Sequence, residues 1–222
     1  MTYPLPIRTL VGLIIAVVAV GCAPSVANRN SGATIDQAQQ ESVDGPKKRI
    51  AVMPFDVKVH KAGSIGNGMS DMLADALVNT NRFIVLERQN AKDVMAEQDF
   101  GRSGRVKKET APQIGELEGA QLLIRGAVTV FEPECSAGTL AVVGVKKACV
   151  AINMRIIDAK TGRVVNATTV DGSAMTAGVG LTANVPSMAL PLGLGGWSKT
   201  PMERAIRNCI DSAVQHIVKT GL

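Results

Sequence analysis

Residues 150–170 read VAINMRIIDAKTGRVVNATTV, and this stretch decides the class of fold. Apolar and polar residues alternate through Val150–Ile157 and again through Arg163–Val170, which is typical of strands with one buried face. Between the two strands, Asp158-Ala159-Lys160-Thr161-Gly162 supplies residues that favour a tight turn. The stretch therefore predicts a pair of antiparallel strands.

A further strand and an amphipathic helix flank this pair. Leu122–Phe131 shows the same alternation and predicts a strand with two distinct faces. Pro201–Val218 predicts a helix, because apolar residues recur there every three or four positions. Its apolar stripe consists of Met202, Ala205, Ile206, Cys209, Ile210, Ala213, Val214 and Ile217.

The first folded segment has a strand followed by a helix. We expect a strand over Ile50–Val59, in which Pro54 indicates an edge position or a bulge. A glycine-bearing turn over Gly63–Gly68 then leads into a helix. The helix is indicated by the spacing of Met69, Met72, Leu73, Ala76 and Leu77.

The middle of the chain continues this mixture. Phe83–Leu86 predicts a short buried strand, and Ala91–Phe100 predicts a helix with Val94 and Met95 facing inward. A short helix is expected from Thr110 to Leu117, because a proline lies in its first turn. Mixed elements followed by antiparallel strands predict an α+β domain.

Composition excludes several classes of protein. The chain has 222 residues, of which 46% are hydrophobic and 19% charged, so it is neither disordered nor collagen-like. The net charge of +5 is spread along the chain and does not indicate a nucleic-acid partner. Aromatic residues make up only 3%, too few for a surface on which bases stack.

The N-terminus resembles a bacterial export signal over residues 1–21. Arg8 gives a charged start, and the apolar run Leu10–Val20 is shorter than the about 20 residues of a spanning helix. Small residues directly before Cys22 resemble the lipobox of lipoproteins, which implies that Cys22 is lipidated and that Ala23 favours the outer membrane. The alternative is an ordinary secretory signal and an incidental cysteine. Residues 22–46 predict a lipidated N-terminus and a flexible tether.

The other cysteines are Cys135, Cys149 and Cys209. An exported protein reaches a compartment that permits disulfides, and Cys135 and Cys149 are placed to face each other across two antiparallel strands. The sequence leaves open whether these two form a disulfide or all three are buried free thiols. No cysteine or histidine spacing indicates a metal site.

Two segments, 136–148 and 173–199, are candidate membrane hairpins, because lysines are their only charged residues. In the second, apolar positions alternate with small or polar ones, as in a strand between lipid and water. Residues 174–185 and 188–198 each reach the about 9–11 residues of a spanning strand. Candidate pore-lining residues are Gly178, Gly180, Thr182 and Asn184. Candidate lipid-facing residues are Val179, Leu181, Val185, Leu190, Leu192, Leu194 and Trp197, the last at the membrane interface.

A glycine-rich surface loop, or a strand pair packed on a soluble partner, is the alternative for these segments. A single hairpin cannot span lipid alone, because its edges would expose unpaired backbone. The membrane interpretation therefore requires many copies that close one barrel, and predicts a ring-shaped oligomer.

An ordered series of short motifs resembles the family of curli secretion channels and holdfast-anchoring lipoproteins (CsgG/HfaB-like). The resemblance covers about residues 48–220, which is nearly all of the mature chain and of the expected domain over residues 47–220. The most specific motif is Leu86-Glu87-Arg88-Gln89 in its strand-to-helix context. The others are Ile50-Ala51-Val52-Met53-Pro54-Phe55, Leu123-Ile124-Arg125-Gly126, Ile152-Asn153-Met154-Arg155-Ile156-Ile157-Asp158 and Thr200-Pro201.

This resemblance implies a lipid-anchored α/β domain that faces the periplasm, whose hairpins join those of neighbouring copies in one outer-membrane β-barrel. It also implies export or anchoring of appendage or adhesin subunits by diffusion, with accessory assembly proteins as partners. The expected pore constriction has no counterpart, because Val57–Gly68 is short and lacks aromatic residues.

No active site is evident in the sequence. His60 and His216 have no evident nucleophile as a partner, so we expect no enzyme, no cofactor and no metal. The second hypothesis is a lipoprotein without a pore, which acts as a periplasmic adaptor or activator of an envelope-assembly partner. The short segment between Cys135 and Cys149 favours this second hypothesis, whereas the alternating hairpin favours a channel.

Overall fold

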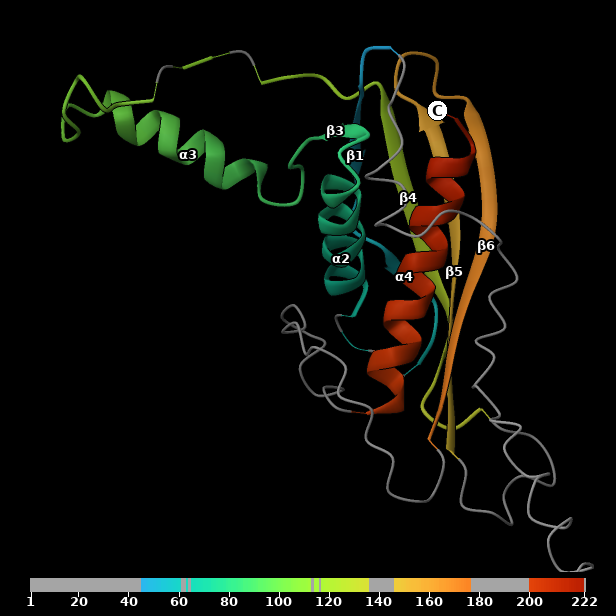
Figure 1. Ribbon diagram of the computed structural model, residues 1–222. Helices are drawn as coiled ribbons and strands as arrows, with labels where there is room; N and C mark the ends of the chain where they lie inside the picture. The colour runs from blue at the N-terminus through green and yellow to red at the C-terminus, as the bar shows by residue number, and fades with distance from the viewer. Residues whose placement is uncertain are drawn as a thin grey trace, which may run out of the picture.

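The computed structural model describes residues 45–60, 63, 65–112, 114–115, 117–135, 146–176 and 200–221 (Figure 1). Its helices are α2 (Ile65–Asn79), α3 (Ala91–Arg102) and α4 (Pro201–Lys219). The strands are β1 (Lys48–Val52), β2 (Asp56–Val57), β3 (Phe83–Val85), β4 (Leu122–Glu132), β5 (Lys146–Asp158) and β6 (Val164–Thr176).

These strands form one mixed sheet in the order β3-β1-β4-β5-β6, with β2 also paired to β4. β1 runs parallel to β3 and β4, whereas β5 runs antiparallel to both β4 and β6. The predicted α+β class and the late antiparallel strands are therefore confirmed.

The expected strand over Ile50–Val59 is divided in two. Val52 pairs with Ile124 and Asp56 pairs with Ala127, so residues 53–55 lie opposite the two residues 125–126. The extra residue is a bulge next to Pro54, whose backbone lacks an N–H group for the ladder. Among the described strands, β2 pairs with β4 alone, so Pro54 lies where the chain reaches an edge of the sheet, and the expected bulge and edge position both agree with the structure.

The bulge turns Phe55 into the core. A Cβ atom on Gly126 would stand 2.7 Å from Phe55 Cδ1, so glycine makes room for the ring on β4. A Cβ on Gly66 would stand only 2.1 Å from the Phe55 carbonyl oxygen. The sequence analysis placed Gly66 in a turn, but it lies in the first turn of α2, which begins at Ile65. Glycine at this position lets the helix start directly beside the bulge.

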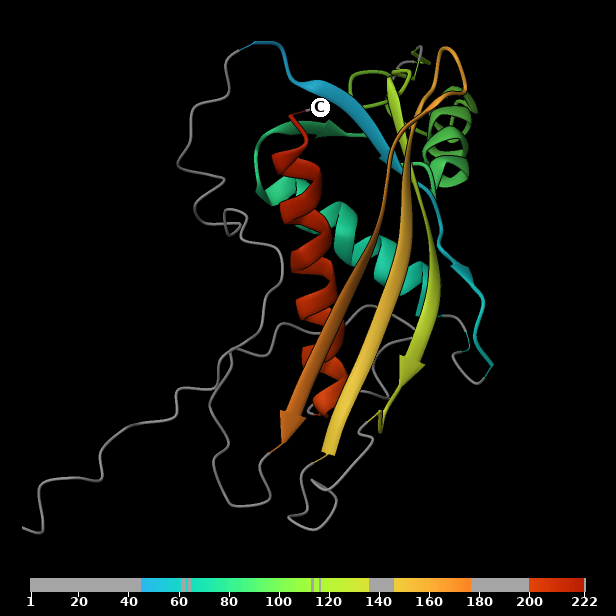
Figure 2. The same ribbon diagram turned by 90° about the vertical axis from the view of Figure 1, so that its right-hand side faces the viewer.

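Helices α2 and α4 cover one face of the sheet (Figure 2). The predicted stripe of α4 is buried there, and Met202, Ile206 and Ile217 are each at most 1% exposed. They join Met154 and Ile156 of β5 in one continuous core. Burial of such a stripe is the main driving force for holding a helix on a sheet.

The helix α3 has a different environment from the one expected. It extends away from the rest of the domain in Figure 1, and none of its residues is buried. Val94 and Met95, which were expected to face inward, are 40% and 46% exposed. The expected helix from Thr110 to Leu117 is also wrong, because the described residues of that stretch are not helical.

β5 and β6 are longer than the sequence predicts, with 13 residues each. They pair from Ile157 and Val164 to Lys146 and Thr176. The ends of the two candidate hairpin segments, 146–148 and 173–176, are therefore part of the sheet. Among the described residues, no helix is both long and apolar enough to cross a membrane.

Candidate functional site

The two candidate membrane segments leave the domain at one end of the sheet, which we call the basal edge. β4 ends there at Glu132, β5 begins at Lys146 and β6 ends at Thr176. α4 runs antiparallel to β6, since Asn208 bonds to Ser173 near this edge and His216 bonds to Asn166 at the far end. α4 therefore also starts at the basal edge, and each segment leaves from it and returns to it.

The side chains predicted to line a pore or face lipid lie outside the described residues, as does Cys22. The pore-lining set is Gly178, Gly180, Thr182 and Asn184, and the lipid-facing set runs from Val179 to Trp197. The structure therefore positions the base from which they extend, and their faces stay predictions.

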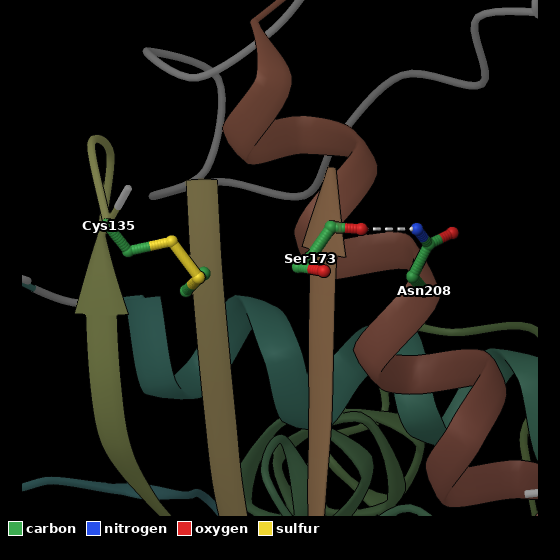
Figure 3. The surroundings of a disulfide bond; sticks show 4 residues. Cys135, Ser173 and Asn208 are labelled. Atoms are coloured by element: carbon green, nitrogen blue, oxygen red, sulfur yellow. Dashed lines mark hydrogen bonds between the residues drawn. A yellow bond between two sulfur atoms is a disulfide. The ribbon is translucent and has the colours of Figure 1, made fainter. Parts of the chain in front are cut away.

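A disulfide joins the segment that follows β4 to β5 at the basal edge. Cys135 is bonded to Cys149, with 5.8 Å between their Cα atoms, so the pairing that the sequence left open is present in the structure (Figure 3). The Cys135 N–H also donates to the carbonyl oxygen of Lys147 over 2.8 Å. The covalent bond and this hydrogen bond fix both ends of the segment 136–145 against each other.

α4 is held to β6 beside this disulfide. Asn208 Nδ2 donates to the carbonyl oxygen of Ser173 over 2.9 Å (Figure 3). One residue along β6, a Cβ on Gly172 would stand 2.1 Å from the carbonyl oxygen of Ala205, so the helix approaches this strand as closely as glycine permits. Sequence analysis did not single out Gly172 or Asn208. For Gly172, the sequence feature that could have indicated this close contact is a glycine in the strand that packs against the apolar stripe of α4.

The third cysteine, Cys209, is a buried free thiol. Its sulfur lies 3.6 Å from the carbonyl oxygen of Val170, as a weak donor. Burial, together with the nearby charge of Asp171, raises the pKa of the Cys209 thiol to about 12. The thiol therefore stays protonated and unreactive at neutral pH, and Cys209 is a core residue.

The motif Leu86-Glu87-Arg88-Gln89 forms the corner between β3 and α3. Glu87 Oε1 accepts the N–H of Asn90 over 2.8 Å, and Arg88 donates from Nη2 to the carbonyl oxygen of Glu118. Gln89 Nε2 donates to Asp71 Oδ1 of α2 over 2.6 Å. Each polar residue of the motif thus ties the corner to a different segment.

A cleft of about 510 Å³ lies between this corner and α2. It is lined by Asp71, Asp75 and Glu87 among others. Burial raises the pKa of Asp71, the carboxylates of Asp75 and Glu87 raise it further, and the hydrogen bond from Gln89 opposes them. Among the described residues, no group of three or more side chains is arranged to hold a metal ion.

The two histidines lie in different surroundings. His216 Nε2 lies 2.8 Å from Asn166 Oδ1, which links α4 to β6. Burial lowers the pKa of His216, and the charge of Lys219 lowers it further, so the neutral ring is the favoured form. His60 is exposed after β2.

Comparison with known proteins identifies related families and folds. Residues 31–222 match the family described as curli production assembly/transport component CsgG. No curated protein matches the chain. Hypothetical protein CT253 from Chlamydia trachomatis is 14% identical, with a TM-score of 0.50 over 79% of this chain and 98% of that chain.

Two other solved structures are more distant. Protein XCC0632 from Xanthomonas campestris is 11% identical, with a TM-score of 0.45 over 79% of this chain and 86% of that one. A PelC dodecamer from Paraburkholderia phytofirmans is 13% identical, with a TM-score of 0.38 over 78% and 93%. At these identities, the likeness to CT253 concerns the fold alone.

Proposed function

The chain belongs to the CsgG family of curli production assembly/transport components, and from this membership we propose that it is an outer-membrane lipoprotein whose copies form a ring-shaped secretion channel. The channel exports or anchors appendage or adhesin subunits by diffusion through a water-filled lumen. Its folded domain faces the periplasm, and it performs no catalysis.

One observation carries the channel proposal. β5 and β6 stay paired as far as Lys146 and Thr176, which border the two segments, and both segments leave from this edge. Strands that leave a sheet side by side can stay paired as they continue, because their backbone groups are already in register. β5 and β6 would then extend as neighbouring strands of two different hairpins. The alternating pattern of 177–198 then supplies one face for lipid and one for water.

A ring is required by the physics of the bilayer. A hairpin in lipid leaves the N–H and C=O groups of its outer edges unpaired, and each such group costs several kcal/mol. Only hairpins from further copies can pair these edges and close a barrel. The proposed channel is therefore a homo-oligomer.

The lipid anchor is proposed at Cys22. Acyl chains contribute about 0.8 kcal/mol per buried methylene, so two or more chains hold a protein firmly in a membrane. We expect Cys22→Ser to move the protein from the membrane fraction to the soluble periplasmic fraction, whereas Cys209→Ser leaves it membrane-bound. A membrane-bound Cys22→Ser protein that resists carbonate extraction would argue against this anchor and for insertion of the hairpins alone.

A second function is favoured by the first segment. Residues 146–148 belong to β5, so only the ten residues 136–145 are left between the sheet and the disulfide. Two spanning strands need about 9–11 residues each. This shortage favours a lipoprotein without a pore, which binds an envelope-assembly partner.

The size and conductance of the protein distinguish the two functions. The lipidated protein is extracted in detergent, its mass is measured, and single-channel currents are recorded in planar bilayers. A channel predicts a large ring with stable conductance that is lost in Leu181→Asp and Leu192→Asp, because a charge on the lipid-facing side is destabilising there. Val78→Asp is the matched control, since Val78 is 54% exposed on α2, away from the candidate membrane segments. A monomer, or a ring without current, would favour the adaptor.

A further inference from the structure

Among the described residues, no helix covers the face of β4, β5 and β6 that points away from α2 and α4, and we call it the open face. Pairing places Leu123 beside Ile157 and Ile157 beside Val164, which gives an apolar row across three strands. Val164 is 52% exposed and Leu123 and Ile157 are half-buried. This row lies near the end of the sheet opposite the basal edge.

Two arginines lie in the next row of the open face. Arg125 and Arg155 are direct partners across β4 and β5, and both are exposed. Among the described residues, neither forms an ion pair, and Asp171 lies two rows further toward the basal edge. Like charges placed directly opposite each other destabilise a sheet. The open face is therefore complementary to an apolar surface that carries carboxylates.

α3 has such a surface. Ala91, Val94, Met95 and Gln98 follow helical spacing and form one stripe. Glu97 and Asp99 flank this stripe on its two sides, at the angles of a 3.6-residue helix. With Val94 40% and Met95 46% exposed, the stripe is uncovered in the single chain.

Chain topology assigns α3 to the side of the open face. β3, β1 and β4 are parallel, and the connection from β3 to β4 runs across the sheet in the direction opposite to that from β1 to β3. Right-handed crossovers therefore place α2 and α3 on opposite sides. Figure 2 shows α3 on the side away from α2 and α4, and Figure 1 shows it displaced beyond β3, where it cannot cover β4 and β5 of its own chain.

Both ends of α3 are held in this displaced position. At its start, Glu87 bonds to Asn90, and Arg88 bonds to the Glu118 carbonyl on the returning strand connection. At its end, a Cβ on Gly101 would stand 2.9 Å from Pro112 Cδ, so the helix packs directly on the loop that follows it. We propose that the stripe of α3 docks on the open face of an adjacent copy, with Glu97 and Asp99 paired to Arg125 and Arg155.

This contact rests on the proposed ring, because it supplies the interface between neighbouring copies. The apolar stripe of one copy covers the apolar row of the next. The carboxylates of the stripe also neutralise the two arginines that face each other. Each copy then gives one helix and receives one, which is the head-to-tail pattern that generates a ring when the rotation between copies closes.

Cysteine cross-linking of the full lipidated protein tests the contact. Met95→Cys and Ile157→Cys are combined in one chain, oxidised mildly in the membrane and separated on a non-reducing gel. A ladder of dimers and higher oligomers that is absent from either single variant supports the proposal. The control pair Lys92→Cys with Ile157→Cys is expected to give a weaker ladder, because Lys92 lies outside the stripe.

Other results overturn the proposal. A cross-linked monomer would show that α3 folds onto its own sheet. An oligomeric protein without cross-links would show that another occupant, such as the N-terminal segment, covers the open face, while the proposed ring would survive. A protein that is monomeric in detergent would reject both the ring and this interface.

Charge reversal gives an independent test on exposed side chains that the fold does not need. Arg125→Glu with Arg155→Glu is expected to convert the oligomer to monomer at the concentration where the natural chain is assembled. Adding Glu97→Lys and Asp99→Lys is expected to restore the oligomer. Unchanged assembly in the first variant, or no recovery in the second, would contradict the pairing.

Discussion

Gly172 determines how closely α4 approaches the sheet. A Cβ there would stand 2.1 Å from the Ala205 carbonyl oxygen and 2.4 Å from the Cys209 nitrogen, and neither backbone atom can move without shifting the helix. Overpacking of this kind costs about 1–3 kcal/mol, and more where backbone must move. We expect Gly172→Ala to lower the free energy of unfolding by at least this amount in urea. Gly115→Ala, where a Cβ meets nothing within 4 Å, is the control and should leave it nearly unchanged.

His216 makes stability depend on pH. Its pKa is lowered in the folded state, first by burial and then by Lys219, so the unfolded chain binds more protons as the pH falls below the ordinary value near 6.5. The contribution of His216 is therefore fully present above about pH 6.5 and is lost as the pH falls toward the lowered pKa. We expect the free energy of unfolding to decrease between pH 7.5 and 5.5, and to decrease less in His216→Gln. Equal slopes in the two proteins would contradict this assignment.

At the scale of elements, the disulfide links the segment that follows β4 to β5, where residues 136–145 begin and end. A closed loop of about 15 residues stabilises by about 3 kcal/mol in the chain-entropy account. We expect Cys135→Ser with Cys149→Ser to lose about this amount in urea unfolding without reductant. Reductant should bring the natural chain to the stability of the variant, and a variant as stable as the natural chain would show that the hydrogen bond to Lys147 suffices.

Elements with a one-sided apolar pattern were predictable, and their surroundings were not. The stripe of α4 predicted a buried helix, and the alternation of β5 predicted a strand, because each pattern fits a single burial geometry. The stripe of α3 predicted a helix equally well, but the pattern does not say which surface covers Val94 and Met95. The inward orientation was wrong because, within the described part of the chain, no surface covers them.

Register explains other differences between sequence and structure. Lys146 and Thr176 are polar, so nothing in their side chains showed that β5 and β6 continue to these residues. The facing of Arg125 and Arg155 depends on the register of β4, which shifts between Val128 and Val130. Pro112 gave a helix-start signal without a following apolar stripe, and the described residues there form no helix. The corner motif could be recognised in the sequence. Its hydrogen bonds to α2 and Glu118 could not be predicted, because they join segments that only the fold brings together.

For the whole molecule, the position of the N-terminal strand constrains how the protein can sit on a membrane. β1 is paired with the first residues of β4, so the chain enters the domain at the end opposite the basal edge. β5 has 13 residues, which at about 3.3 Å per residue corresponds to about 43 Å. If the lipid and the hairpins occupy the same membrane, residues 23–47 must cover this length. Twenty-five residues reach about 80–90 Å when extended, which is sufficient.

Shortening this connection tests the proposed orientation. Deletion of residues 26–41 leaves nine residues between Cys22 and Lys48, which reach about 30 Å and fall short of the domain length. We expect the deletion variant to stay in the membrane fraction and to lose conductance, because an anchored domain cannot then bring its basal edge to the bilayer. Replacement of the same residues by glycine and serine of equal number should retain conductance. A conducting deletion variant would mean that the basal edge does not face the membrane that holds the anchor.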